Sequence, residues 1–181
     1  MRGDLEHAAQ ASLRAHVLAP GSGEVATLAS MILLQLGRYR EARALALHAA
    51  AQPARPDDLF RIARLLARFE EPEALERLFL TSQWRALDSV PAFAELAQLL
   101  GFAGLYDLAF ECLAHAHALD PLAADVHYLR GLFEMFSGRM AASQASIRRA
   151  IELEPRMASA HWLLAMQEKA DTAGQHVEQI R

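Results

Sequence analysis

Residues 124–157 of the chain, ADVHYLRGLFEMFSGRMAASQASIRRAIELEPRM, decide its fold, because their pattern recurs along the sequence. A shift of 34 residues superimposes several pairs of identical residues, among them Gly104 on Gly138, Ala116 on Ala150, Leu119 on Leu153 and Pro121 on Pro155. The same step connects a ladder of small residues, Ala63, Ala97, Gly131 and Ala165. Small residues let two helices approach closely, and proline ends one pair of helices before the next begins. The period therefore predicts a series of helix hairpins.

Composition favours an all-α protein. The 181 residues include 37 Ala and 29 Leu but only five Ile and five Val. Alanine and leucine are among the strongest helix formers, whereas β-branched residues, which a buried sheet requires, are scarce.

Charge and cysteine content exclude several classes of protein. The net charge is −4, so the chain lacks the basic surface of a nucleic-acid-binding domain. The single cysteine, Cys112, cannot form an internal disulfide and is typical of a reducing compartment. No apolar segment is long enough to span a membrane, and the first residues lack the apolar core of a secretory signal. We therefore expect a cytoplasmic location, without nucleic-acid or membrane partners.

The repeated residues resemble the tetratricopeptide repeat (TPR) family, whose 34-residue unit is a helix hairpin. Tyr128, Gly131 and Gly138 carry the resemblance in the best unit, and Leu36-Gly37-Arg38-Tyr39 matches the same hairpin turn near the N-terminus. The resemblance implies an all-α, TPR-like α-solenoid, in which about ten antiparallel helices form a right-handed superhelix with a concave inner face. The expected hairpin turns lie near Gly37, Glu70–Pro72, Gly104 and Gly138.

This resemblance implies one TPR-like domain over residues 1–181. Its expected parts are a half-repeat at 4–20, repeats at 23–55, 56–89, 90–123 and 124–157, a half-repeat at 158–170, and a polar tail at 171–181. Repeat 23–55 has Pro53 near its end, whereas repeat 56–89 has Glu70-Glu71-Pro72 in place of the glycine turn and lacks a closing proline.

The residues that usually carry chemistry do not combine into a catalytic or metal site. His115 and His117 are two residues apart on one helix and diverge, while His127 and His161 occupy equivalent positions without further ligands. Cys112 lies among apolar neighbours and is expected to be an inert thiol. We therefore predict no catalytic, cofactor-binding or metal-binding residues, and no enzyme activity for this chain by itself.

The first helix of a TPR hairpin lines the concave face, and this implies a set of candidate groove residues. They are Phe60, Arg64, Arg68, Phe102, Tyr128, Leu132, Met135, Trp162 and Met166. Aromatic and Met side chains offer an adaptable apolar surface, while Arg61, Arg64 and Arg68 form a ridge that can pair with acidic groups. Two alternatives stay open: the apolar residues belong to the hairpin core, and the arginines form an ordinary solvated face.

Three functions fit this pattern. The first is a protein-interaction scaffold whose groove binds a peptide or helical segment of a partner. The second is a chaperone like the small TPR chaperones of type III secretion. The third is the helical region of a larger enzyme, because residues 160–165 and 175–180 resemble the junction in bacterial TPR-sulfotransferases. The identity of the partner, the oligomeric state, occupation of the groove by the chain's own tail, and whether the chain is a fragment of a larger protein stay open.

Overall fold

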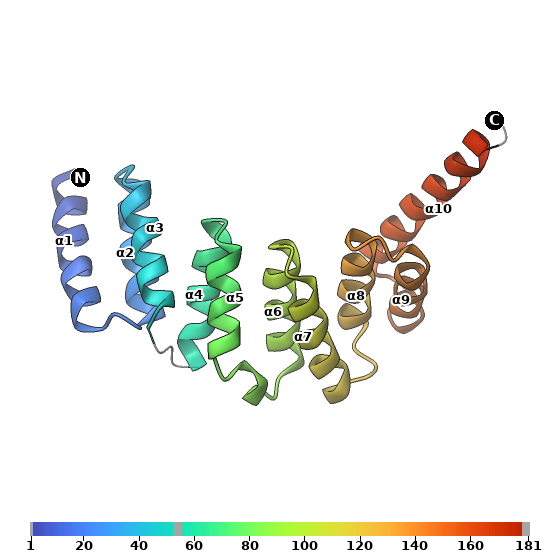
Figure 1. Cartoon of the computed structure of the whole chain (residues 1–181), viewed down its shortest axis with the longest axis horizontal. Helices are drawn as coiled ribbons and strands as arrows, with labels where there is room; N and C mark the ends of the chain where they lie inside the picture. Colours follow the sequence, from blue (N-terminus) through green and yellow to red (C-terminus); the bar gives the residue numbers. More distant parts are fainter. Residues whose placement is uncertain (1, 53–55, 179–181) are drawn as a thin grey trace. The chain divides into compact units, whose positions relative to one another are not determined.

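The computed structural model describes residues 2–52 and 56–178, and the side chains of residues 3–52 and 58–168. Pro53, which the sequence places near the end of repeat 23–55, lies outside the described residues. Within them the fold consists of ten α-helices and one short 3₁₀ helix, without strands (Figure 1). The helices are α1 (Arg2–Leu18), α2 (Gly23–Gln35), α3 (Tyr39–Ala50), α4 (Pro56–Arg68), α5 (Pro72–Thr81), α6 (Val90–Phe102), α7 (Tyr106–Leu119), α8 (Ala124–Phe136), α9 (Met140–Leu153) and α10 (Ala158–Glu178), with η1 (Trp84–Ala86) after α5.

All four predicted hairpin turns are confirmed. Gly37, Gly104 and Gly138 adopt φ angles of 75°, 80° and 78°, a left-handed conformation that glycine reaches without steric strain. In the hairpin that lacks the glycine, Glu70 adopts the same conformation with φ of 56°. The backbone of Gly138 donates to Met135 O, and that of Arg139 donates to Glu134 O, so the last turn of α8 is closed by the hydrogen bonds typical of a Schellman motif.

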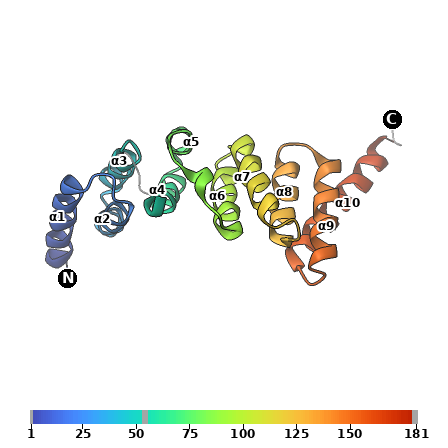
Figure 2. The ribbon, with the colours of Figure 1, turned by 90° about the horizontal axis from the view of Figure 1, so that it is seen from below.

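The chain divides into two compact units. The N-terminal unit comprises residues 1–87 and 102–105, and the C-terminal unit comprises residues 88–101 and 106–181. Within each unit consecutive helices run side by side, as two perpendicular views show (Figures 1 and 2).

The N-terminal unit has a buried apolar core, and a polar contact joins the starts of α2 and α4. Its largest fully buried side chains are Leu33, Ile62, Leu66, Leu75, Phe79 and Trp84. The Asp58 carboxylate accepts a 2.8 Å hydrogen bond from the backbone N–H of Gly23 at the start of α2. A Cβ atom on Gly23 would lie 2.8 Å from the Asp58 carbonyl oxygen, so glycine permits this close approach of α2 and α4.

The C-terminal unit packs α8 and α9 closely together, because a small residue lies where they cross. Gly131 is buried against Ile147, and the Ser143 hydroxyl donates a 2.6 Å hydrogen bond to the Gly131 carbonyl oxygen. Gln167 of α10 then donates to the same Ser143 hydroxyl at 2.8 Å. This buried polar chain fixes the register of α8, α9 and α10.

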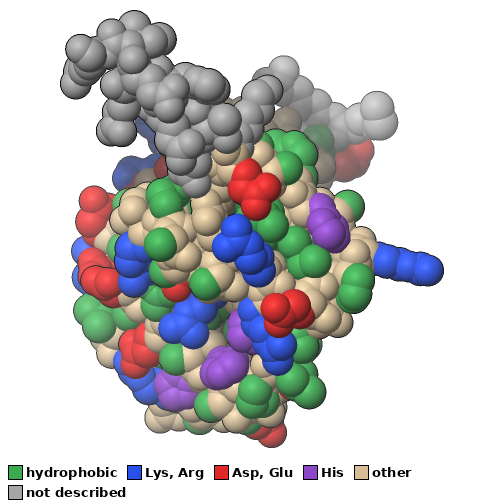
Figure 3. Space-filling view, turned by 90° about the vertical axis from the view of Figure 1, so that its right-hand side faces the viewer, with side chains coloured by type: hydrophobic (Ala, Val, Ile, Leu, Met, Phe, Trp, Pro, Cys, Tyr) green, Lys and Arg blue, Asp and Glu red, His purple; other side chains and the backbone are tan. Residues whose placement is uncertain are grey.

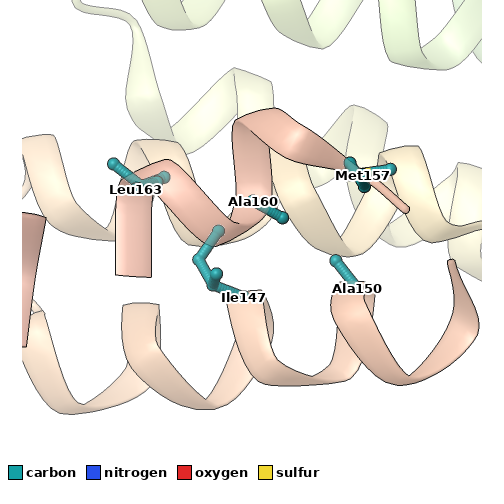
Figure 4. Packing of buried hydrophobic residues seen from close by; sticks show 5 residues of the cluster. All are labelled: Ile147, Ala150, Met157, Ala160 and Leu163. Carbon is teal, nitrogen blue, oxygen red and sulfur yellow. The ribbon is translucent and has the colours of Figure 1, made fainter. Parts of the chain in front are cut away.

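A cluster of buried apolar residues joins α9 to α10. Its members are Ile147, Ala150, Met157, Ala160 and Leu163, of which Ile147 and Ala150 point from α9 toward α10 (Figure 4). Full burial of an aliphatic side chain such as Ile147 or Leu163 contributes about 1.5–3 kcal/mol.

Helix α10 is longer than the sequence pattern predicts. We expected it to end near Ala170, but it continues to Glu178. Residues 171–178 read DTAGQHVE and contain no proline, while Ala173, Gln175 and Glu178 tolerate helical backbone well. The polar composition of this segment therefore does not end the helix.

Candidate functional site

The predicted groove residues fall into two sets, one in each unit. Phe60, Arg64 and Arg68 lie on α4, and Phe102 lies in the last turn of α6, within the N-terminal unit. Tyr128, Leu132 and Met135 lie on α8, and Trp162 and Met166 on α10, within the C-terminal unit. Each set is described by itself.

In the N-terminal set the cationic side chains face solvent. Arg61, Arg64 and Arg68 are exposed on α4, and Phe60 is half-buried beside them in sequence. Arg61 lies 3.7 Å from the buried Asp58 carboxylate, so one member of this ridge also neutralises a buried acid. Phe102 is 63% exposed at the end of α6.

In the C-terminal set the α8 residues contribute to packing. Tyr128, Leu132 and Met135 are half-buried and pack against the cluster formed by α9 and α10. Together with Ala124 they follow one side of α8 at intervals of three or four residues, and we call these four residues the α8 stripe. For these three residues half-burial fits both interpretations, hairpin core and groove lining, because each side chain has a buried and an accessible part.

The α10 residues differ from their α8 counterparts. Trp162, which follows Tyr128 by 34 residues, is 64% exposed, and Met166, which follows Leu132 by the same step, is 44% exposed. Sequence reasoning missed that Ala158 and Ala165 are also exposed on this helix. The repeat register could not have revealed this exposure, since their counterparts Ala124 and Gly131 are half-buried and buried.

Charged groups lie close to both helices. Glu134 on α8 is only 7% exposed, accepts a 2.7 Å hydrogen bond from the Ser146 hydroxyl, and lies 3.5 Å from Arg130. Its counterpart on α10, Glu168, is exposed and lies 3.4 Å from Arg148. On the face shown in Figure 3, apolar side chains lie interspersed with arginine, acidic and histidine side chains.

The histidines take part in structural contacts. His127 Nε2 donates to the carbonyl oxygen of Pro121, and His161 Nε2 to that of Pro155, at 3.0 Å in both cases. These two equivalent hydrogen bonds stabilise the turns that precede α8 and α10. Among the residues with described side chains, no three His, Cys, Asp or Glu groups are close enough to hold a metal ion.

One further pair of histidines lies in the N-terminal unit. His16 Nε2 and His48 Nδ1 are 2.8 Å apart, which is a hydrogen bond between α1 and α3. Burial of the His16 ring lowers its pKa below 6.5, and the charge of His48 lowers this pKa further. The folded unit therefore disfavours the charged form of His16.

None of the described helices is both long and apolar enough to cross a membrane. Cys112 is fully buried in α7, where solvent cannot reach its thiol.

Comparison with known proteins identifies the fold. Residues 124–157 match the model of the tetratricopeptide repeat family. The structure is similar to YrrB, a TPR protein with an unusual peptide-binding site, with a TM-score of 0.61, 19% sequence identity, and coverage of 89% of this chain and 84% of YrrB. It is also similar to MamA, with a TM-score of 0.52, 15% identity, and coverage of 87% of this chain and 92% of MamA. No curated protein has significant sequence similarity to the chain. These likenesses confirm the TPR-like α-solenoid.

Proposed function

We propose that the chain is a protein-interaction scaffold that binds a peptide or helical segment of a partner protein. The observation that carries this proposal is the exposure of Trp162 and Met166, which lie one helical turn apart on α10. A large aromatic side chain that is two-thirds exposed adds little to folding, and tryptophan is among the residues most often found at the centre of protein interfaces. The fold itself supports the same function, since repeat arrays of this kind present extended binding surfaces.

The proposed binding residues are those that the sequence singled out. In the C-terminal unit, Trp162 and Met166 provide accessible apolar surface, and Tyr128, Leu132 and Met135 provide half-buried surface. In the N-terminal unit, Arg64 and Arg68 favour a partner segment with acidic residues, and Phe60 and Phe102 are the proposed apolar residues. YrrB, whose fold is similar, is described as having a peptide-binding site, and this supports a peptide ligand here.

The proposal assigns no catalytic step and no cofactor to the chain itself. The buried Cys112 fits an inert packing role, and a sequence with a single cysteine fits a cytoplasmic location. Nothing in the comparisons favours the alternatives of a sulfotransferase-type enzyme or a secretion chaperone over a general scaffold.

Site-specific photocrosslinking tests the proposal. The photoreactive residue p-benzoylphenylalanine replaces Trp162 in one variant, Phe60 in a second and Leu80 in a control. Leu80 is 67% exposed on α5 and is not among the proposed binding residues. We expect specific crosslinked products from Trp162 and Phe60, and none from Leu80, in cells that express the protein.

A further variant tests whether the arginines of α4 contribute to binding. If the partner segment is acidic, Arg64→Glu lowers the crosslinking yield at Phe60, and added salt reduces the difference from the wild type. Equal labelling from Leu80 and Trp162, or no specific product from any position, would contradict the scaffold proposal.

A further inference from the structure

The exposed residues of α2 lie on one side of that helix. They are Glu24, Leu28, Met31 and Gln35, at intervals of three or four residues, so they form one row along the helix. The central two are apolar, and Leu28 is 56% exposed while Met31 is 50% exposed. At least half of each of these two side chains is therefore accessible to another molecule.

The equivalent row on α4 is cationic. The exposed positions of α2 recur on α4 after 33 residues, which is the distance between the first residues of the two helices. Arg61 and Arg64 take the places of Leu28 and Met31, and Arg68 extends the row. These three arginines are the exposed residues among the described side chains of α4. An apolar row on one first helix thus has a cationic row as its counterpart on the next.

The two rows lie side by side within the N-terminal unit. The backbone N–H of Gly23 donates a 2.8 Å hydrogen bond to the Asp58 carboxylate, and a Cβ atom at Gly23 would lie 2.9 Å from Cβ of Arg61. Helices α2 and α4 therefore contact each other on one side of the unit, and α3 and α5 lie on the other (Figure 2). Because the rows occupy equivalent positions of successive hairpins, they face the same direction, on helix axes about 8–10 Å apart.

We propose that this surface binds an acidic amphipathic α-helix of a partner protein. The α2–α4 surface, as we call it, consists of Leu28 and Met31 on α2 with Arg61, Arg64 and Arg68 on α4. The inference rests on the proposed scaffold function and names the class of partner. A helix fits both rows, because its side chains recur every three or four residues and can form an apolar row and an acidic row on adjacent sides. An extended segment alternates its side chains between opposite sides and presents only one of the two rows to the surface.

Charge determines how the partner helix lies on the α2–α4 surface. Guanidinium groups bind carboxylates through paired hydrogen bonds, so the acidic row of the partner faces α4. One nitrogen atom of Arg61 lies 3.7 Å from the Asp58 carboxylate, and the same guanidinium has further N–H donors for a second acid. Glu24, at the start of the α2 row, repels acids, so the apolar row of the partner faces Leu28 and Met31.

The same chemistry favours a protein partner over other polyanions. A nucleic acid has a phosphate at every nucleotide but no row of aliphatic side chains for Leu28 and Met31. The net charge of the chain is −4, so a polyanion is repelled at long range. A short acidic helix has few charges and gains apolar contacts on α2.

Three synthetic peptides with blocked ends serve as probes. In the acidic peptide, leucine recurs at every third or fourth position of an alanine background, and glutamate follows each leucine. The second peptide has lysine in place of each glutamate, and the third has proline in the middle of the acidic sequence, where it breaks the helix. We expect the full chain to bind the acidic peptide about tenfold more tightly than either of the others, as measured by calorimetry.

Two variants, each with a matched control, locate the binding surface. Arg68→Glu should weaken the acidic peptide about tenfold and strengthen the lysine peptide, and added salt should reduce both effects. Arg40→Glu makes the same change of charge at an exposed position of α3 and should leave both affinities nearly unchanged. Met31→Gln should weaken the acidic peptide about threefold, whereas Leu80→Gln changes an exposed leucine of α5 and should have no effect. Circular dichroism verifies that each variant is folded.

Several outcomes would overturn the inference. They are equal affinity for the acidic and lysine peptides, undiminished binding of the proline peptide, and equal loss of binding in Arg68→Glu and Arg40→Glu. Tighter binding of phosphatidylserine vesicles than of the acidic peptide would also overturn it, since a membrane surface would then be the ligand. If Trp162 gives crosslinked partners while the acidic peptide does not bind, the scaffold function stands and the acidic helix fails. If neither experiment gives binding, both proposals fail.

Discussion

Gly131 and Ile147 are packed so closely that a single added Cβ atom at Gly131 would lie 2.6 Å from Cδ1 of Ile147 and 3.1 Å from the Ser143 backbone oxygen. The isoleucine can shift only partly, because it also belongs to the buried cluster between α9 and α10. Close contact of α8 and α9 thus depends on the absence of a side chain at residue 131.

Replacement of this glycine should destabilise the protein. We expect Gly131→Leu to lower the free energy of unfolding by about 1–3 kcal/mol or more, because overpacking forces the two helices apart. Thermal and urea denaturation, followed by circular dichroism, measure the change. Gly3→Ala is the control, since nothing lies within 4 Å of its Cβ position, and it should be neutral or slightly stabilising. A melting temperature of Gly131→Leu within a degree of the wild type would contradict this packing.

At two of the hairpin turns, replacing glycine by alanine and replacing glutamate by glycine should change the stability of the protein in opposite directions. Gly138→Ala should lower stability by about 1 kcal/mol, because alanine is strained at φ of 78°. Glu70→Gly should raise stability by up to about 1 kcal/mol, since it relieves the same strain at φ of 56°. Urea midpoints of the two variants provide the comparison. If both substitutions lower the midpoint, contacts of the Glu70 side chain outweigh its backbone strain.

Tyr128 and Trp162 should respond differently to truncation, although they occupy equivalent positions. Tyr128→Ala should cost about 1–3 kcal/mol, because the ring packs against the cluster of α9 and α10. Trp162→Ala should change stability by less than about 0.5 kcal/mol, because its ring is mostly in solvent. Thermal melts of the two variants separate these expectations. A large loss in Trp162→Ala would show that the ring supports the fold instead of a partner.

The His16–His48 pair makes stability depend on pH. Because the pKa of His16 is lowered in the folded state, the unfolded chain binds more protons as the pH falls through about 6.5. The contribution of neutral His16 is therefore complete above this pH and decreases below it. We expect the melting temperature to fall between pH 7 and pH 5.5, with a smaller fall in His16→Gln. An identical pH profile for the variant would assign the dependence to other groups.

The sequence predicted the hairpins because glycine, proline and small residues recur at a fixed period. Glu70 shows the limit of this inference, since a non-glycine residue takes the left-handed turn that the other hairpins assign to Gly. The end of α10 was missed because polar residues such as Gln175 and Glu178 are compatible with helix as well as with loop.

The candidate site could be predicted only in part. Tyr128 and Trp162 occupy equivalent positions in the repeat, yet one is half-buried and the other is exposed. Their exposure differs because different helices pack against them. The repeat pattern of the sequence does not say which neighbours cover a given residue. Exposure therefore had to come from the structure.

Among the described residues, helices in substantial contact are adjacent in the chain or separated by one helix. Contacts so local in sequence require the closure of only short loops, so the barrier to refolding is low. We expect refolding within about microseconds to milliseconds, much faster than for a β-rich protein of similar length. Repeat arrays of this kind open segment by segment, so a truncation or a local break should leave the distant hairpins folded.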